Sequence, residues 1–491
     1  MRSALFVSLL AVSLLLVTAS AAPAARRPNV LLVSVDDLSV TALGCYGRAH
    51  MKTPNIDKLA ARGVRFDLAY CQYPLCNPSR VSMLIGQRPD TAQVHDLAMN
   101  FRSTVPDAVT LPQLFRQNGY FTARSGKIFH YGVPREIGTS GKDDPASWDE
   151  VVNPIGIDKT EESQLKVLTK GTGTTTIGFA MAWREMDGPD EEQTDGKGTT
   201  AAIELLERAA KADKPFFIGL GFYRPHTPFV ATKKWFDLYP KESVKLPEVP
   251  ADDEADLPER AFRIRPPNYG LAESDLRDCL RGYWASVSMI DAQLGRVMEA
   301  LERLKLAEDT IIVFFSDHGF LLGEHTQWQK QMLFDESPRV PLIIAAPGMK
   351  GNGTPSPRAV ELLDVYPTIR ELAHLPEPPQ KLEGRSLVPL LNEPTTPSER
   401  PAYSQVTRRM GKGAEARIVM AYSVRTERWR FTDWGKGPGG GLELYDHQND
   451  PNEWKNLAKD PAHVKVVTEM KKLLDPVATM KTPTTLPIRD W

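Results

Sequence analysis

Short apolar runs rich in β-branched residues alternate with helical patterns along this chain, and this alternation constrains the fold more than any other feature. The apolar runs lie at residues 29–35, 64–70, 120–124, 215–222, 310–316 and 341–346. The helical patterns lie at residues 54–62, 111–118, 200–210 and 274–306. Strands that alternate with helices predict a doubly wound α/β domain with a mostly parallel sheet. Ligands bind to such sheets beyond the carboxyl ends of the strands.

The pattern changes after about residue 378. Short strands are expected at residues 401–406, 417–426, 428–433 and 442–446, with a helix near 462–474. We therefore predict a catalytic α/β domain at residues 26–378 and a smaller α+β subdomain at residues 379–491, built on an antiparallel sheet with one helix. Residues 131–197 are rich in Gly, Asp, Thr and Lys, and we expect long surface loops there that line a substrate cleft.

Residues 1–25 have the pattern of a signal peptide. Arg2 precedes an apolar run, and small residues follow that run at positions 19–22. The run is short for a membrane span, so an uncleaved anchor is the less favoured alternative, and no later stretch is long and apolar enough to be a span. We therefore predict an exported protein, periplasmic, secreted or in the lysosomal lumen, with no membrane span after removal of the signal. Because 60 Lys and Arg balance 62 Asp and Glu, no nucleic-acid partner is expected.

The chain has only four cysteines, too few for a disulfide framework in 491 residues. No C-x-x-C pair occurs, so a structural zinc site is not expected. Whether Cys45, Cys71 and Cys279 form a disulfide stays open.

Two acidic pairs far apart in the sequence occupy the same kind of position. Asp36 and Asp37 end the first predicted strand, and Asp317 with His318 follows a later one. Carboxylates that lie close together in a buried cleft repel each other, and a divalent cation relieves that repulsion. Oxygen-rich ligation favours Ca²⁺ over softer metals. Either pair alone is more typical of an acid that caps a turn, so the metal prediction depends on both pairs.

The run from Cys76 to Gly86 has the features of a helix start. A proline is well placed near the beginning of a helix, and Asn77 is expected to cap it. Cys76 would then lie just outside the helix N-terminus, where free amides and the dipole favour an anionic ligand. A buried structural cysteine is the ordinary alternative.

This run fits C-x-P-S-R-x-x-x-L-x-G and resembles the signature of the type I, formylglycine-dependent sulfatases. Three further stretches resemble motifs of that family: residues 119–127 with His130 after them, residues 316–330, and the P-H-x-P around His226. The resemblance implies an alkaline-phosphatase-like fold. It also implies that a formylglycine-generating enzyme oxidises Cys76 to formylglycine (3-oxoalanine).

The same resemblance gives expected roles to individual residues. One Ca²⁺ per chain is expected on Asp36, Asp37, residue 76, Asp317 and His318. Catalytic roles are expected for Cys76, Arg80, Lys127, His130, His226 and Lys330, of which Lys127, His226 and Lys330 also bind substrate. In the implied reaction, a hydroxyl of the hydrated aldehyde attacks sulfur and His226 protonates the leaving oxygen. His130 then accepts a proton as sulfate leaves.

Several short motifs resemble the iduronate-2-sulfatase subfamily, and His318, where many sulfatases carry Asn, does so too. The expected activity is therefore a sulfuric ester hydrolase acting on a sulfated oligosaccharide or polysaccharide. A 2-O-sulfated uronic acid of a glycosaminoglycan is the expected substrate. The candidate sugar contacts are His95, Asp96, Asn100 and Arg224.

Three alternatives stay open. The first alternative is a sulfatase of another sulfated polysaccharide. The second is a non-catalytic binder of sulfated glycans, in which Cys76 is not converted to formylglycine. The third alternative is a phosphatase or phosphonate hydrolase of the same superfold. Its paired zinc ions would need more ligands than the histidines in the motifs, His130, His226, His318 and His325, provide.

Overall fold

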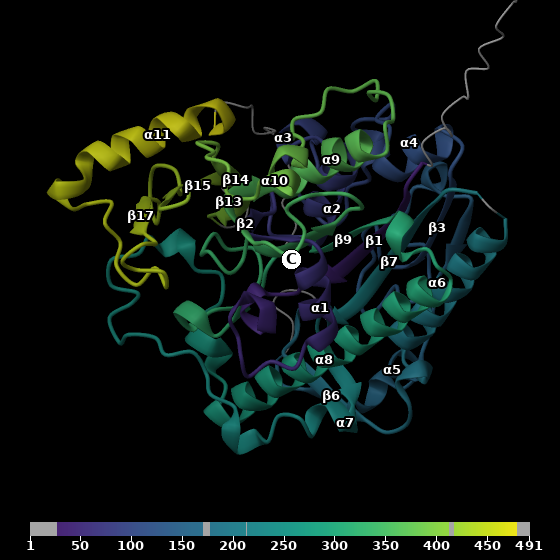
Figure 1. The fold of residues 1–491 in the computed structure, drawn as a ribbon. Coiled ribbons are helices and arrows are strands. Elements are labelled where there is room, and N and C mark those ends of the chain that lie inside the picture. Colours follow the sequence, from purple (N-terminus) through teal and green to yellow (C-terminus); the bar gives the residue numbers. More distant parts are fainter. Residues whose placement is uncertain (1–26, 170–176, 213, 412–416, 479–491) are drawn as a thin grey trace, which may run out of the picture.

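The structure is a computed structural model, and it describes residues 27–169, 177–212, 214–411 and 417–478 (Figure 1). Its centre is an eight-stranded sheet in the order β13-β2-β12-β9-β1-β7-β3-β4. The strands are β1 (Asn29–Asp36), β2 (Val64–Tyr70), β3 (Phe121–Gly126), β4 (Glu150–Val152), β7 (Phe216–Pro225), β9 (Thr310–Ser316), β12 (Arg339–Ala345) and β13 (Ser356–Glu361). Neighbouring strands are parallel except for the two pairs that β12 makes.

Strand β1 lies in the middle of this sheet, between β9 and β7. Val33 pairs with Leu220 of β7 and with Phe314 of β9. Because successive side chains of a strand point to opposite faces, Val33 belongs to one hydrophobic core and Leu32 to the other. A strand buried on both faces is what a parallel sheet covered by helices requires.

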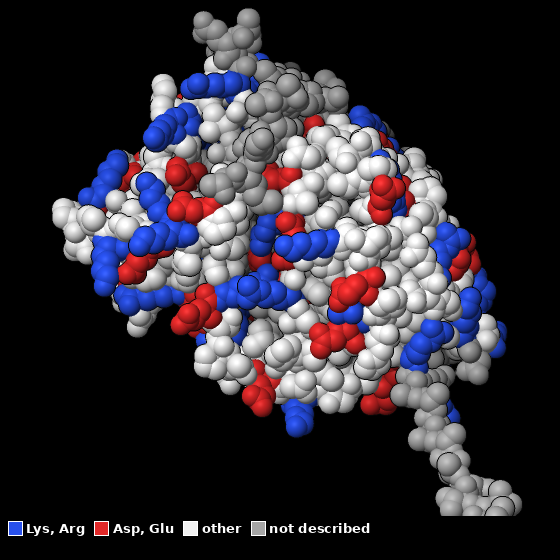
Figure 2. Space-filling view, turned by 90° about the horizontal axis from the view of Figure 1, so that it is seen from above, with Lys and Arg blue, Asp and Glu red and all other residues white. Residues whose placement is uncertain are grey.

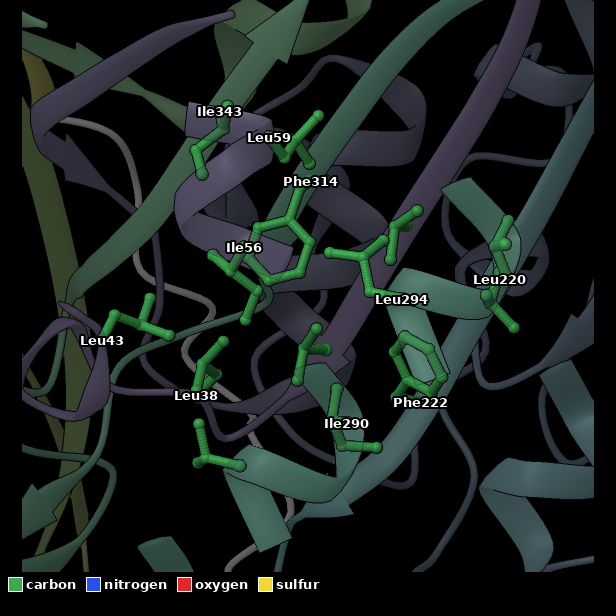
Figure 3. Close-up of a cluster of buried hydrophobic side chains, with 14 of the residues drawn as sticks. Leu38, Leu43, Ile56, Leu59, Leu220, Phe222, Ile290, Leu294, Phe314 and Ile343 are labelled. Atoms are coloured by element: carbon green, nitrogen blue, oxygen red, sulfur yellow. The ribbon is translucent and has the colours of Figure 1, made fainter. Parts of the chain in front are cut away.

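Helices cover both faces of the sheet (Figure 1). One face carries α1 (Pro54–Arg62), α6 (Thr194–Lys211) and α8 (Glu273–Arg303), and the other carries α2 (Cys76–Ile85), α4 (Leu111–Gln117) and α9 (Val365–Leu372). Figure 3 shows the first of these cores, in which Ile290 and Leu294 of α8 cluster with Phe222 of β7 and Phe314 of β9. The helix predicted at residues 274–306 corresponds to α8, and its buried apolar side chains face this core.

Smaller elements surround the main sheet. Strands β14 (Ala402–Met410), β15 (Arg417–Arg425), β16 (Trp429–Asp433) and β17 (Leu442–Asp446) form an antiparallel sheet against which α11 (Val464–Ala478) packs. The remaining strands are β5 (Lys166–Val167), β6 (Ala182–Met186), β8 (Phe229–Thr232), β10 (Leu321–Leu322) and β11 (Trp328–Gln329). The remaining α-helices are short: α3 (Pro89–Ala92), α5 (Ile157–Thr160), α7 (Lys233–Phe236) and α10 (Val388–Asn392).

The predicted fold class is confirmed, with a mostly parallel central sheet and a small C-terminal antiparallel sheet with a helix. The expectation of loops throughout residues 131–197 is wrong in part, because β4, α5 and β6 lie there and α6 begins at Thr194. Gly196 and Gly198 lower the helix propensity of the first turn of α6. A Cβ at position 196 would lie 1.9 Å from the carbonyl oxygen of Asp190, so the close packing of this turn needs glycine.

The face of the molecule shown in Figure 2 carries no dominant charge of one sign. Basic and acidic side chains are interspersed on the face that Figure 2 shows, as expected for a formal net charge of −2. Anion binding therefore depends on a local arrangement of side chains. Among the described helices, none combines the length and apolarity needed to cross a membrane. The predicted signal peptide at residues 1–25 lies outside the described residues.

Candidate active site

The two acidic pairs meet at the carboxyl edge of the central sheet. Asp36 is the last residue of β1, and Asp317 directly follows the neighbouring strand β9. The amide of Asp37 donates to Asp317 Oδ1 over 3.3 Å, and the amide of His318 donates to the same oxygen over 3.1 Å. All four side chains are fully buried. Adjacent parallel strands thus bring together carboxylates that are 280 residues apart in the chain.

Residue 76 is the first residue of α2, so the expected position just outside that helix is wrong by one residue. The residue before the helix is Leu75, and Asn77 does not cap it. Instead, the side-chain amide of Asn77 donates to the carbonyls of Asp96 (2.7 Å) and Met99 (2.8 Å). Cys76 therefore lies in the first turn of α2, where the helix amides lack intrahelical partners.

Arg80, one turn into α2, joins the helix to both acidic strands. Its Nε donates to Asp317 Oδ2 (2.8 Å) and its Nη2 to Asp36 Oδ1 (3.1 Å). Its Nη1 donates to Ser34 Oγ and to the carbonyls of Lys127 and Ile128. All three nitrogens of the guanidinium thus donate inside the protein, which fixes the two carboxylates relative to residue 76.

Two buried lysines pair with different carboxylates of this cluster. Lys127 Nζ forms an ion pair with Asp36 Oδ2. Lys330 Nζ donates to Asp37 Oδ1 over 2.6 Å and lies 3.2 Å from Cys76 Sγ. Both ammonium groups therefore lie where they face the carboxylates, and Lys330 also faces the side chain of residue 76.

His318 presents its Nε2 atom to the same centre. Its Nδ1 donates to the carbonyl of Gly319 (2.8 Å), while Nε2 lies 3.2 Å from Asp37 Oδ1 and 3.4 Å from Cys76 Sγ. Burial lowers the pKa of His318 to about 4, so the ring is neutral near pH 7. A neutral imidazole with one nitrogen held by a carbonyl is the form that binds metals.

These side chains fit a divalent cation. Oxygen, sulfur and nitrogen atoms of Asp36, Cys76, Asp317 and His318 lie within 4.8 Å of one another, as do those of Asp36, Asp37, Cys76 and His226. Asp37 Oδ2 is buried with no hydrogen-bond partner among the described atoms. Burial, followed by the charges of Asp36 and Asp317, raises the pKa of Asp37 to about 7 although Lys330 opposes the shift. Three buried carboxylates and one imidazole are a donor set for a hard cation such as Ca²⁺.

A pocket of about 300 Å³ opens directly onto this cluster. Of the predicted catalytic residues, it is lined by Cys76, His130, His226 and Lys330. His226 Nδ1 donates to the carbonyl of Thr227 (2.7 Å), which leaves Nε2 facing Asp37 Oδ2 at 3.8 Å. Burial is the first cause that lowers the pKa of both His130 and His226, and nearby lysines lower it further. The predicted catalytic residues thus lie in this pocket or, for Arg80 and Lys127, directly behind it.

The candidate sugar contacts do not line this pocket. Buried His95 pairs with Asp90 (2.8 Å), and buried Arg224 pairs with Asp158 (2.8 Å). Asp96 accepts hydrogen bonds from two amides that follow it, and Asn100 caps the short turn after it. The structure gives these four residues a role within the fold.

One supporting residue was not predicted. The hydroxyl of Tyr283 in α8 donates to the carbonyl of Asp37 (2.6 Å) and accepts from the amide of Ser39 (2.8 Å). It thereby holds Asp37 at a φ of +65°, in the left-handed region where Asp is tolerated better than most residues. The sequence gives no signal for this role, because an aromatic residue within a long amphipathic helix is typical of core packing.

Comparisons with known proteins agree with this arrangement. A family model described as Sulfatase matches residues 28–375, and one described as N-sulphoglucosamine sulphohydrolase, C-terminal, matches residues 323–480. Iduronate 2-sulfatase of Homo sapiens is 34% identical over 510 residues, which cover 88% of this chain and 91% of that protein.

Solved structures of other proteins align with this chain over most of its length. The phosphonate monoester hydrolase of Agrobacterium radiobacter aligns with a TM-score of 0.74 at 23% identity, over 93% of this chain and 97% of that one. A 2-O GAG sulfatase aligns with a TM-score of 0.68 at 25% identity, over 92% of this chain and 91% of that one. The likeness to the hydrolase shows a shared fold alone.

Proposed function

The chain belongs to the sulfatase family and hydrolyses sulfate esters, and from that premise we propose that its substrate is a carbohydrate with a 2-O-sulfated uronic acid. The identity of 34% to iduronate 2-sulfatase supports this choice, as does the similarity to a 2-O GAG sulfatase. The volume of the pocket, about 300 Å³, is at the lower end of the range of small-molecule sites, which suits one sugar unit. Export of the protein is part of the proposal, on the pattern of residues 1–25.

Residue 76 is proposed to act as formylglycine, made from Cys76 by a formylglycine-generating enzyme. The thiol is a poor nucleophile where it lies, because burial and the charge of Asp36 raise its pKa. One Ca²⁺, held by Asp36, Asp37, residue 76, Asp317 and His318, would lower the pKa of a hydroxyl bound to it and so supply a nucleophile near pH 7.

The remaining side chains bind the sulfate group and move protons. Lys127 and Lys330 offset the negative charge that the sulfuryl oxygens carry while the bond from sulfur to the alcohol oxygen breaks. Nδ1 of His226 donates to the carbonyl of Thr227, so His226 can protonate that alcohol oxygen only after its Nε2 has taken up a second proton, which the negative charge of the bound sulfate group favours. His130, which lines the same pocket, accepts the proton released when inorganic sulfate forms.

One observation carries this proposal. Cys76 Sγ lies 3.4 Å from His318 Nε2 and 3.2 Å from Lys330 Nζ, at the floor of the pocket. A residue that accepts a sulfuryl group needs positive charge on one side and open space on the other, and at position 76 Lys330 supplies the charge and the pocket the space.

A panel of defined sulfated disaccharides tests the substrate. Free sulfate is measured by ion chromatography after incubation with 2-O-sulfated uronic acids and with 6-O-, 4-O- and N-sulfated sugars. The proposal expects the highest kcat/KM on the 2-O-sulfated uronic acids. A clear preference for one of the other sugars would contradict the substrate, and loss of all activity after Cys76→Ala would still support the sulfatase chemistry.

A further inference from the structure

Lys142 is a cation at the pocket that the proposed reaction does not use. It lines the same pocket as Cys76, His130 and His226. Among the described residues, its ammonium group has no hydrogen-bond or ion-pair partner. The two fully buried lysines differ from Lys142 in this respect, because Lys127 pairs with Asp36 and Lys330 pairs with Asp37.

The acidic residues around Lys142 are neutralised by other groups. Asp143 pairs with Arg124 and accepts from the indole of Trp148 over 3.0 Å. Asp144 pairs with Arg102 over 2.8 Å. The two acids that follow Lys142 in the sequence are therefore paired with arginines, and neither neutralises the charge of Lys142.

Among the described residues that line the pocket together with Lys142, only Glu136 carries a carboxylate. Its Oε2 accepts from the amide of Gly132 over 2.6 Å, and its Oε1 lies 3.3 Å from Arg135 Nη2. Arg135 and Glu136, which both line the pocket, thus offset each other's charge. The positive charge that remains available to a ligand there is that of Lys142.

Backbone contacts of residues 141 and 142 fix the position from which the Lys142 side chain extends. The amide of Lys142 donates to the carbonyl of His130 over 2.9 Å. The preceding residue, Gly141, has a φ of +50°, and a Cβ there would lie 1.9 Å from the ring of Tyr131. This close approach holds the start of the Lys142 side chain beside the backbone of His130, on the wall of the pocket.

We propose that Lys142 binds a second negative charge of the substrate, the carboxylate of the uronic acid whose 2-O-sulfate lies at residue 76. This inference rests on the proposed function. A 2-O-sulfated uronic acid carries two anionic groups on one sugar ring, a sulfate and a carboxylate. The residues around position 76 are proposed to bind the sulfate, and none of them is assigned to the carboxylate. A charge-assisted hydrogen bond from a lysine whose charge is not otherwise paired favours the second over a neutral group at the same position.

The test compares paired substrates. A 2-O-sulfated uronic acid disaccharide is set against the same compound with its carboxyl group reduced to an alcohol. For Lys142→Met, kcat/KM on the carboxylate substrate is expected to fall about tenfold or more, the loss typical of a hydrogen bond to a charged group. On the reduced substrate kcat/KM is expected to change by less than about twofold, and Lys142→Arg should restore part of the preference.

The matched control is Lys245→Met, an exposed lysine that lines a different pocket. It should leave the ratio between the two substrates unchanged. Equal losses on both substrates for Lys142→Met, or no loss on either, would overturn the inference.

A binding measurement separates this inference from the proposed function. In chains that carry Cys76→Ala, calorimetry gives the dissociation constants of both disaccharides without turnover. If Lys142→Met weakens binding of the carboxylate compound alone, the inference holds even when the chain with Cys76 shows a different preferred substrate. If binding of the two compounds is weakened equally or not at all, the inference fails whatever the turnover data show.

Discussion

Arg80 shows how one side chain organises the proposed centre. It donates to Asp36, Asp317, Ser34 and two backbone carbonyls, so all three of its guanidinium nitrogens form hydrogen bonds. A lysine would keep the charge but could not form this planar set of hydrogen bonds. The position is therefore one where an exchange between the two basic residues is not conservative.

Arg80→Lys is predicted to lower the free energy of unfolding by about 1–3 kcal/mol, because buried acceptors lose their donors. It is also predicted to lower kcat at least about tenfold, since Asp36 and Asp317 lose their fixed positions. Urea unfolding and sulfate release measure the two effects. Arg116→Lys, in a partly exposed pair with Asp149, is the control and should change stability by less than about 0.5 kcal/mol. A fully stable and active Arg80→Lys would contradict the role given to this residue.

The loss of kcat on replacement of His226 is predicted to increase with the basicity of the leaving alcohol. His226→Ala should lower kcat on a sugar sulfate by about 10²–10⁴-fold, because a sugar alkoxide needs a proton as it leaves. On 4-nitrophenyl sulfate, whose phenolate leaves without one, the loss should be much smaller. Steady-state kinetics with both substrates provide the comparison, and equal losses would rule out proton donation by His226.

At the scale of elements, helix α1 depends on a side chain from another helix. Asp291 of α8 accepts from the amides of Asn55 (2.9 Å) and Ile56 (2.7 Å) in the first turn of α1. The residue before that helix, Thr53, makes no capping hydrogen bond with its side chain. A tertiary contact thus replaces the local cap and connects two helices on the same face of the sheet.

Asp291→Ala is predicted to lower the free energy of unfolding by about 1–3 kcal/mol, since it leaves buried amides without an acceptor. Asp291→Asn keeps one side-chain oxygen for those amides and should cost less. Chemical denaturation of the three proteins at one pH gives the order. A cost for the alanine variant no larger than for the asparagine variant would show that the contact is not a cap.

The same carboxyl predicts a pH dependence. Burial raises the pKa of Asp291 to about 6, above its value of about 3.9 in an unfolded chain. The folded protein therefore holds this proton more tightly, so stability from this group is present at low pH and is lost as pH rises through about 4 to 6. Relative to Asp291→Asn, the unfolding free energy of the unmodified chain should decrease over that window. An increase would contradict the assignment of the shift to this group.

Much of the element order could be predicted because periodicity is local. The predicted strands at 64–70 and 310–316 coincide with β2 and β9, and the predicted helix at 54–62 coincides with α1. The first turn of α6 was missed because its glycines serve packing, which a local pattern does not contain. The capping of α1 by Asp291 was missed for the same reason, since the partner is more than 200 residues away.

At the scale of the whole molecule, the central sheet brings residues from motifs that are far apart in the sequence close together in space. The edge of β1 and β9 supplies the carboxylates, α2 supplies residue 76 and Arg80, and later segments supply His226, His318 and Lys330. Sequence motifs predicted this set of residues. They did not predict Tyr283 or Lys142, because neither lies in a motif and their positions follow from packing and from the turn at Gly141. The division at residues 378 and 379 stays a prediction.

Calcium is predicted to stabilise the whole chain, because the proposed site draws its ligands from several segments. At a free Ca²⁺ concentration about 100 times the dissociation constant, the gain is about 2.7 kcal/mol. Differential scanning calorimetry with and without a chelator measures the shift of Tm, and readdition of Ca²⁺ should restore both Tm and activity. Asp317→Ala is the control and should abolish the shift. Indifference of Tm and activity to the chelator would contradict the site.

The central claim is that residue 76 acts as an aldehyde beside a divalent cation. Peptide mass spectrometry across residues 71–80 of a preparation with measured sulfatase activity tests it most directly. The account predicts that the fraction of chains with the aldehyde mass at position 76 rises in proportion to specific activity between preparations. Full activity in a preparation whose residue 76 is entirely an unmodified thiol would contradict it.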